Sequence, residues 1–186
     1  MVLLSIGVLL FAVVHFVPSL MPELKQAGLS KLGDGGYKGV FSLLLLGSFA
    51  LMIVGWRSAE VTYLYQPPAA LRTIALALML AAFVLLAASS LKSRIKQFIR
   101  HPQLTGVALW SVAHLMLNGD SRSAVLFVGL GLWAILSILL INRRDGAWTK
   151  DEVPPMAAEF VLLATAAVTI AVTIYIHPWI SGVNVF

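Results

Sequence analysis

Apolar residues dominate long stretches of this chain, and charged residues fall almost entirely between them. Six uncharged stretches follow one another along the sequence: Met1–Met21, Gly39–Trp56, Thr73–Leu91, His101–Gly119, Ser123–Asn142 and Phe160–Phe186. A helix needs about 20 apolar residues to cross the hydrocarbon core of a bilayer. The pattern therefore predicts an all-α polytopic membrane protein, a bundle of six transmembrane helices of which the fourth is short.

Composition agrees with this pattern. The chain is 60% hydrophobic and 11% charged over 186 residues, and six spans with their connections take up nearly all of it. We therefore expect one integral membrane domain over residues 1–186. The chain has no cysteine, which excludes disulfides, iron–sulfur clusters and haem attachment through CxxCH.

The basic residues predict the orientation. Ten Lys and Arg residues fall in the segments that follow the first, third and fifth spans, and only Arg57, Arg72 and Arg122 fall on the other side. Lys and Arg accumulate in cytoplasmic loops, so both termini are expected in the periplasm of a bacterial inner (cytoplasmic) membrane. The excess of positive charge is then explained by the topology and by contact with anionic lipid, and a nucleic-acid partner is not expected.

Four histidines lie in or beside the apolar stretches, and an ionisable side chain at membrane depth usually has a function. His15 and His114 both lie past the middle of antiparallel spans. Two imidazoles at similar depth could ligate a b-type haem on both axial positions, which makes haem b the expected cofactor. Hydrogen bonding of each histidine to a neighbouring helix is the alternative interpretation.

Arg100 and His101 precede Pro102 at the start of the fourth span. A guanidinium, an imidazole and a helix N-terminus together favour a negative group such as a haem propionate, a phosphate or an acidic cofactor. Contact with lipid headgroups explains the same residues equally well. The glycine-rich segment 31–39 lacks the spacing of a phosphate-binding loop and is expected to be a flexible turn.

Several motifs, in one order, resemble the NnrU family of bacterial membrane proteins, which is associated with nitrite and nitric oxide reduction and so with denitrification. They are His15-x-x-Pro18, Tyr37-Lys38-Gly39-x-Phe41-Ser42, Gly55-Trp56, Arg100-His101-Pro102-Gln103-Leu104-x-Gly106 and Ala113-His114-Leu115-x-x-Asn118-Gly119-Asp120. The family also contains 15-cis-zeta-carotene isomerase, a haem b enzyme. The resemblance implies that His15 and His114 match the axial haem ligands of that isomerase. Ser111 stands where the isomerase has a cysteine, so isomerase activity does not follow from the resemblance.

A second, shorter resemblance concerns Arg100-His101-Pro102-x-x-x-Gly106, which is similar to a segment of isoprenylcysteine-type membrane methyltransferases that bind S-adenosylmethionine. Leu104 replaces the tyrosine of that segment. Three hypotheses therefore follow: a haem b protein of redox metabolism or an isomerase acting on a hydrophobic small molecule, a membrane methyltransferase, and a non-enzymatic accessory factor that binds a respiratory reductase subunit.

Overall fold

A computed structural model describes residues 1–185 of the chain. Its helices are α1 (Val2–Leu20), α2 (Pro22–Ser58), α3 (Leu71–Ser90), α4 (Pro102–Leu115), α5 (Ser121–Ser123), α6 (Gly129–Asp145) and α7 (Ala157–Ser181). A 3₁₀ turn, η1 (Arg94–Gln97), precedes α4, and a π-helical turn, η2 (Ala124–Val128), joins α5 to α6. No strand occurs among the described residues apart from one isolated bridge, which confirms the all-α prediction.

Five helical segments are long and apolar enough to cross a membrane: α1, α2, α3, the continuous α5–η2–α6 segment and α7. The fourth expected span is the exception. Its helix, α4, has 14 residues and is about 21 Å long, shorter than a hydrocarbon core of about 30 Å. Length and composition thus support five of the six expected spans, and the sixth crossing is taken up below as a proposal.

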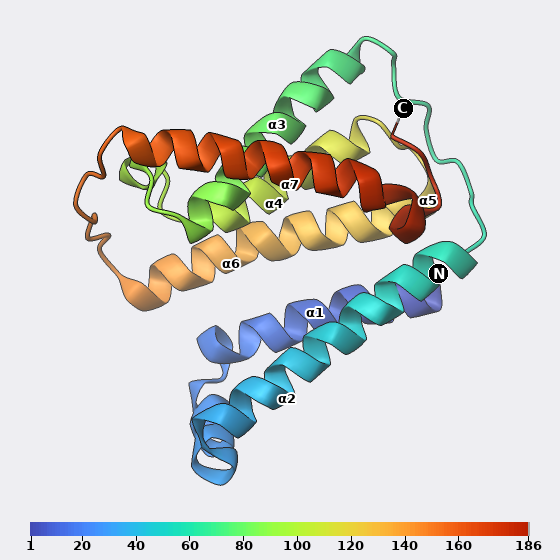
Figure 1. Ribbon diagram of the computed structural model, residues 1–186. Helices are drawn as coiled ribbons and strands as arrows, with labels where there is room; N and C mark the ends of the chain where they lie inside the picture. Colours follow the sequence, from blue (N-terminus) through green and yellow to red (C-terminus); the bar gives the residue numbers. More distant parts are fainter. Residues whose placement is uncertain (186) are drawn as a thin grey trace.

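The helices form two groups (Figure 1). The first is an α1–α2 hairpin, and the second is a bundle in which α3 packs on α4 and α7 while α4 packs on α6. Small residues allow the hairpin to close. A Cβ at Gly7 would come within 2.9 Å of the Ser48 carbonyl oxygen, and a Cβ at Gly55 would overlap the backbone of Leu4. Without side chains, these glycines allow two helix backbones to approach closely.

The hairpin reaches the bundle through α6. Val8 of α1 meets Gly129, and the ring centroids of Phe11 and Trp133 lie 4.8 Å apart. Leu4 and Met52 complete this apolar contact. In Figure 1 α1 runs beside α6, whereas α2 diverges from α6 toward the end of the molecule that carries the α1–α2 connection. The hairpin is therefore held to the bundle mainly along one helix.

The glycine-rich segment 31–39 differs from the expectation of a flexible turn. Helix α2 continues through it, and only Gly33 leaves the helical conformation, with φ 68° and ψ 173°. A positive φ is strained for any residue with a Cβ, so glycine at this position permits a kink rather than a loop. The membrane-length part of α2 begins after this kink.

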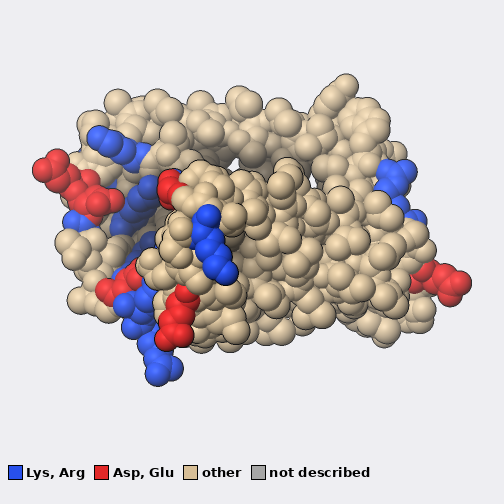
Figure 2. Space-filling view, turned by 90° about the horizontal axis from the view of Figure 1, so that it is seen from below, with Lys and Arg blue, Asp and Glu red and all other residues tan. Residues whose placement is uncertain are grey.

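Charged side chains gather at the two ends of the molecule, with a long uncharged zone between them (Figure 2). At one end the Glu159 carboxylate accepts a hydrogen bond of 2.7 Å from the Arg94 backbone N–H, and Arg100 donates to the Gly146 carbonyl oxygen at 2.7 Å. Arg57 lies at the other end. This separation is what a membrane-embedded bundle requires, because lipid offers no partner to a charge.

Candidate functional site

His15 lies on α1 among aromatic rings, where α1 faces α2 and α6. Its ring centroid is 4.2 Å from that of Phe11, 5.5 Å from Phe41 and 4.9 Å from Trp133. The Nδ1 atom is 2.8 Å from the Phe11 carbonyl oxygen. Because a carbonyl only accepts, Nδ1 must carry the proton and donate it. The Nε2 atom of the neutral ring is then left with its lone pair.

His114 has the same local arrangement on α4. Its Nδ1 atom is 3.0 Å from the Trp110 carbonyl oxygen, one turn earlier, so Nδ1 again donates and Nε2 keeps its lone pair. Phe127 stacks on the ring at 4.3 Å with an interplanar angle of 21°. Phe127 belongs to the π-helical turn η2, and such turns often occur at functional sites because they re-aim one side chain.

The two histidines contact different parts of the α5–η2–α6 segment. His15 packs against Trp133, and His114 stacks on Phe127, six residues earlier. Six residues correspond to about 9 Å along a helix axis. His177 of α7 also has its Nδ1 atom 2.8 Å from a carbonyl oxygen, that of Val183. The two expected ligands thus share the same local chemistry but pack against different rings, and their joint role stays a prediction.

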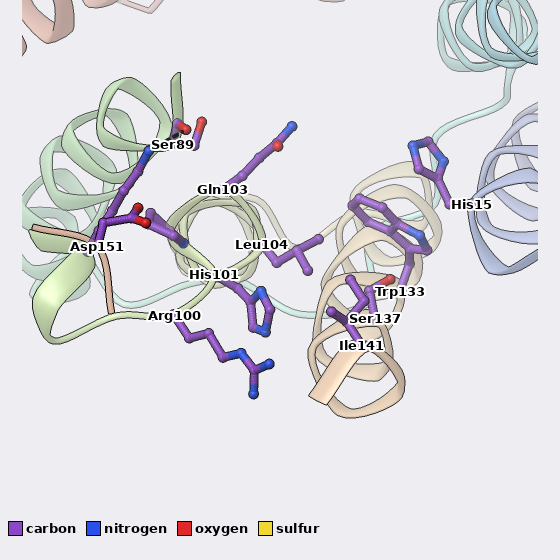
Figure 3. A pocket seen from close by; sticks show the side chains of 12 residues that line it. His15, Ser89, Arg100, His101, Gln103, Leu104, Trp133, Ser137, Ile141 and Asp151 are labelled. Carbon is purple, nitrogen blue, oxygen red and sulfur yellow. Dashed lines mark hydrogen bonds between the residues drawn. The ribbon is translucent and has the colours of Figure 1, made fainter. Parts of the chain in front are cut away.

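A cavity of about 520 Å³ brings together three of the four residues predicted for the site (Figure 3). Its size lies within the range of about 300–1,000 Å³ that is usual for small-molecule sites. Its lining comes from α1, α3, η1, α4, α6 and two loops: His15, Ser89, Lys96, Arg100, His101, Pro102, Gln103, Leu104, Trp133, Ser137, Ile141 and Asp151. His114 does not line it.

The cavity is cationic where α4 begins. Arg100 and His101 stand at that helix N-terminus, as predicted, and Lys96 joins them from η1. Hydrogen bonds hold these side chains in place: Lys96 Nζ donates to the Ser89 carbonyl oxygen at 3.0 Å, Arg100 donates to the Gly146 carbonyl oxygen at 2.7 Å, and His101 Nε2 lies 2.9 Å from Asn142 Oδ1. Asp151 is the one carboxylate in the described lining. The arrangement favours a negative group, as does the helix terminus itself.

Trp133 is a cavity residue that sequence reasoning missed. It is 7% exposed, and its Nε1–H has no hydrogen-bond partner among the described residues. A buried N–H without an acceptor costs free energy, so such groups call for an explanation. Only the position of Trp133 in the middle of an apolar span could have signalled it, since interfacial tryptophans lie near span ends.

A second cavity, of about 710 Å³, lies near the opposite end, beside the Asn118–Asp120 turn. The extended segment 59–70 is bound to this turn: the Leu64 N–H donates to the Gly119 carbonyl oxygen at 2.8 Å, and Tyr65 lies so close that a Cβ at Gly119 would overlap its carbonyl group. The segment therefore acts as a strap across the end of α4, close to His114.

Asp120 caps the N-terminus of α5. Its carboxylate accepts from the backbone N–H groups of Arg122 and Ser123, at 3.0 and 3.1 Å. Burial opposes ionisation of Asp120, but these bonds, the Ser123 hydroxyl and the Arg122 charge outweigh it and hold the pKa of Asp120 below its usual value. Arg122 also lies over the Trp56 ring at 4.7 Å.

Within residues 1–185, no group of three or more histidine, aspartate or glutamate side chains is arranged to hold a metal ion. Axial ligation of a porphyrin iron needs only one or two imidazoles and no such group.

A family model described as NnrU protein matches residues 3–185, nearly the whole chain. No curated protein and no solved structure matches it.

Proposed function

The chain belongs to the NnrU protein family, and we propose that it is an integral membrane protein that binds haem b through His15 and His114. Haem b supplies one-electron redox chemistry when it is bound. The protein would hold the cofactor inside the bilayer and would use its cationic end to bind the cofactor's carboxylates or an anionic substrate. The proposed role in nitrogen-oxide or other redox metabolism comes from what is associated with the NnrU family, and the redox chemistry of haem is compatible with it.

The observation that carries the proposal is the shared state of the two imidazoles. In both, Nδ1–H donates to the carbonyl oxygen four residues earlier, and Nε2 is the nitrogen left for a metal. Metal-ligating histidines usually donate their other N–H to a carbonyl or carboxylate, which fixes the tautomer and the ring orientation. His101 differs, because Asn142 already engages its Nε2 atom.

The surroundings of His15 fit a large flat cofactor. Phe11, Phe41 and Trp133 give it aromatic walls, and the cavity that it lines leads to cations at the start of α4. The Trp133 Nε1–H, which has no acceptor among the described residues, would gain one if a ligand entered between α1 and α6. The donor set and the apolar lining therefore suit haem on the side of the α1–α2 hairpin.

Ligation by both histidines would place the porphyrin between the α1–α2 hairpin and the bundle, because His15 packs on Trp133 and His114 stacks on Phe127. The chain has no cysteine, so spin labels can be attached at cysteines introduced at two chosen positions. Leu20 on α1 and Leu139 on α6 are 57% and 59% exposed. We expect the distance between labels at these positions to change when haem is added to the protein in detergent. An unchanged distance in fully loaded protein would show that the cofactor binds without movement of the hairpin.

Ser111 favours a redox haem protein over an isomerase. Its hydroxyl is buried without a hydrogen-bond partner in residues 1–185, and a Cβ at Gly131 of α6 would lie 3.1 Å from the Ser111 Cβ. A serine hydroxyl is not a soft ligand for iron, so this position offers no exchange of axial ligand of the kind a thiolate would permit.

The direct test is the absorption spectrum of the detergent-purified protein with haem. We expect a Soret band that is lost or strongly shifted in His15→Ala and in His114→Ala, and retained in His101→Ala and His177→Ala. His101→Ala is the matched control, since Asn142 already engages the Nε2 atom of His101. His177 is the rival ligand, since its Nδ1 atom lies 2.8 Å from the Val183 carbonyl oxygen and its Nε2 atom keeps the lone pair. Loss of the band in His177→Ala but not in His15→Ala would instead assign the iron to His114 and His177.

The cavity also supports a second candidate, an S-adenosylmethionine-dependent methyltransferase. Arg100, His101 and Pro102 line it together, and Gly106 lets α4 pack against the Ala82 carbonyl oxygen of α3. A colourless protein that binds S-adenosylmethionine would favour this candidate. A colourless protein that binds neither ligand but co-purifies with a reductase subunit would favour the accessory role.

We further propose six crossings with both termini in the periplasm. Although α4 is short, it runs from the Arg100–Gly146 bond at one end to the Tyr65 bonds at the other, where the Tyr65 hydroxyl donates to the Asn118 carbonyl oxygen at 3.0 Å. Cysteines introduced at Lys92 and Asp145 should resist an impermeant thiol reagent in intact cells, whereas one at Tyr63 should react. The opposite labelling pattern would invert the topology.

A further inference from the structure

The cavity extends to both sides of the start of α4. Figure 3, which looks along the axis of α4, shows Arg100 and His101 on one side of the helix and Ser89 and Gln103 on the other. His15 lies on the same side as Gln103. The pair Arg100–His101 therefore accounts for only one half of the cationic end.

The other half contains Lys96. Its ammonium donates to the Ser89 carbonyl oxygen at 3.0 Å, which places it on the Ser89 side of α4. An ammonium has three N–H donors, so two remain for another acceptor. Asp151 lines the cavity as well, and Lys96 and Arg100 together outweigh its single negative charge. Both sides of α4 thus offer a cation to an occupant.

The deep wall of the cavity is apolar. Leu104 and Trp133 line it near His15, and both are buried, with 9% and 7% exposure. An occupant that fills the cavity therefore meets aromatic and aliphatic surface at its deep end and positive charge on two sides at its shallow end. Apolar surface with two separate cations complements an amphiphile that carries two separate anionic groups.

We propose that Lys96 is the second anion-binding residue of this cavity and that the cavity selects an amphiphile with two separate anionic groups. One group binds Arg100 and His101, and the other binds Lys96 beside Gln103. The proposal rests on the haem function above for the identity of the occupant, since haem is a planar apolar body with two carboxylates. A membrane lipid with two phosphates has the same chemistry, and the experiment separates the two sources.

The probes are metal-free protoporphyrin IX and its dimethyl ester, followed by porphyrin fluorescence in detergent. Neither contains iron, so binding does not depend on axial ligation, and its result is independent of the Soret test. The wild-type protein should bind the diacid more tightly than the ester. Lys96→Gln should weaken diacid binding about tenfold, which corresponds to about 1.4 kcal/mol for one charge-assisted hydrogen bond, and leave ester binding unchanged.

Two variants control this result. Lys92→Gln removes an exposed cation at the same end of the molecule that does not line the cavity, and it should bind both probes like the wild type. Lys96→Arg should restore preference for the diacid. Equal binding of the diacid by Lys96→Gln and Lys92→Gln would overturn the proposal.

Cardiolipin, which carries two phosphates, is the second probe. Displacement of the porphyrin diacid by cardiolipin in the wild type, lost in Lys96→Gln, would support the site and assign it to lipid. A Lys96→Gln protein that still discriminates diacid from ester and is still displaced by cardiolipin would show that Lys96 binds neither anion.

Discussion

His15 and His114 have the same hydrogen bond from Nδ1, yet they belong to regions that are built differently. The α1–α2 hairpin holds His15 beside a cavity, and it contacts the bundle mainly along α6. The bundle holds His114 against Phe127, beneath a strap that is bound to the turn after α4. His15 thus lines a cavity that a ligand could enter, whereas His114 lines neither of the two cavities described above.

This difference bears on how a cofactor could enter. Burial of a ring on both sides fixes it, whereas a site at a loosely packed seam can open at small cost. We therefore expect the hairpin to supply the moving part and the bundle to supply the fixed part of a haem site. The predictions below challenge that division of roles, in order of decreasing effect.

The largest effect is expected from Gly55→Val, which should separate the hairpin. A Cβ at this position overlaps the Leu4 backbone, which cannot move aside as a flexible side chain can, so the cost should exceed the usual cost of overpacking a core, about 1–3 kcal/mol. The midpoint of thermal unfolding in detergent should fall, and haem retention at His15 should fall with it. Gly47→Val is the matched control, because the space around Gly47 on the same helix is open. Equal behaviour of the two variants would show that close helix approach does not hold the hairpin.

Phe127→Ala should weaken the bundle. Phe127 is 4% exposed, and removal of a buried phenylalanine ring costs about 3–5 kcal/mol in soluble cores, with less expected where lipid can fill the space. The Soret band should broaden or shift toward that of His114→Ala. Phe160→Ala, at a 71% exposed position on α7, should leave both stability and spectrum unchanged. A wild-type spectrum in Phe127→Ala would show that the Phe127 ring does not hold His114 in place.

These comparisons also show what could be read from the sequence. Hydrophobic runs were enough to predict the helices, because lipid forces each span to satisfy its own backbone. The short α4 was harder, since residues Met116–Asn118 are apolar or uncharged but form a turn under the strap. The kink at Gly33 was mistaken for a loop, because glycine frequency does not distinguish one positive φ from many.

The site was predicted less completely than the fold. His15, Arg100 and His101 were predicted for the site, and they share a cavity. Lys96, which lines the same cavity, was not predicted, because the orientation of the chain in the membrane already explained the basic residues of its segment. Trp133 gave no signal, because nothing in an apolar run reveals that an indole N–H lacks an acceptor. The offset between His15 and His114 depends on which face of α6 each helix packs against, and single-chain periodicity does not specify that.

Asp120→Ala should produce a smaller and pH-dependent loss at the His114 end. Removal of such a cap costs about 1 kcal/mol. The pKa of Asp120 is lowered in the folded state, so its contribution is present above the unfolded value near 4 and is lost as pH falls through the folded value. The difference in unfolding midpoint between wild type and Asp120→Ala should therefore be full at pH 7 and shrink in acid. A difference that stays constant down to pH 3 would assign the effect to packing.

The smallest effect is expected from Lys38→Gln in the hairpin. Lys38 Nζ and Asp34 Oδ2 are 2.6 Å apart, shorter than any contact of Asp120, but their side chains are 72% and 71% exposed. Exposed pairs one helical turn apart contribute only about 0.3–0.5 kcal/mol, because water and salt screen the charges. The unfolding midpoint of Lys38→Gln should match the wild type at 0.5 M salt and differ slightly at low salt. A loss as large as that of Asp120→Ala would mean that this pair, just after the Gly33 kink, holds the hairpin in place, and the moving part of the site would then lie at the kink rather than at the α1–α6 seam.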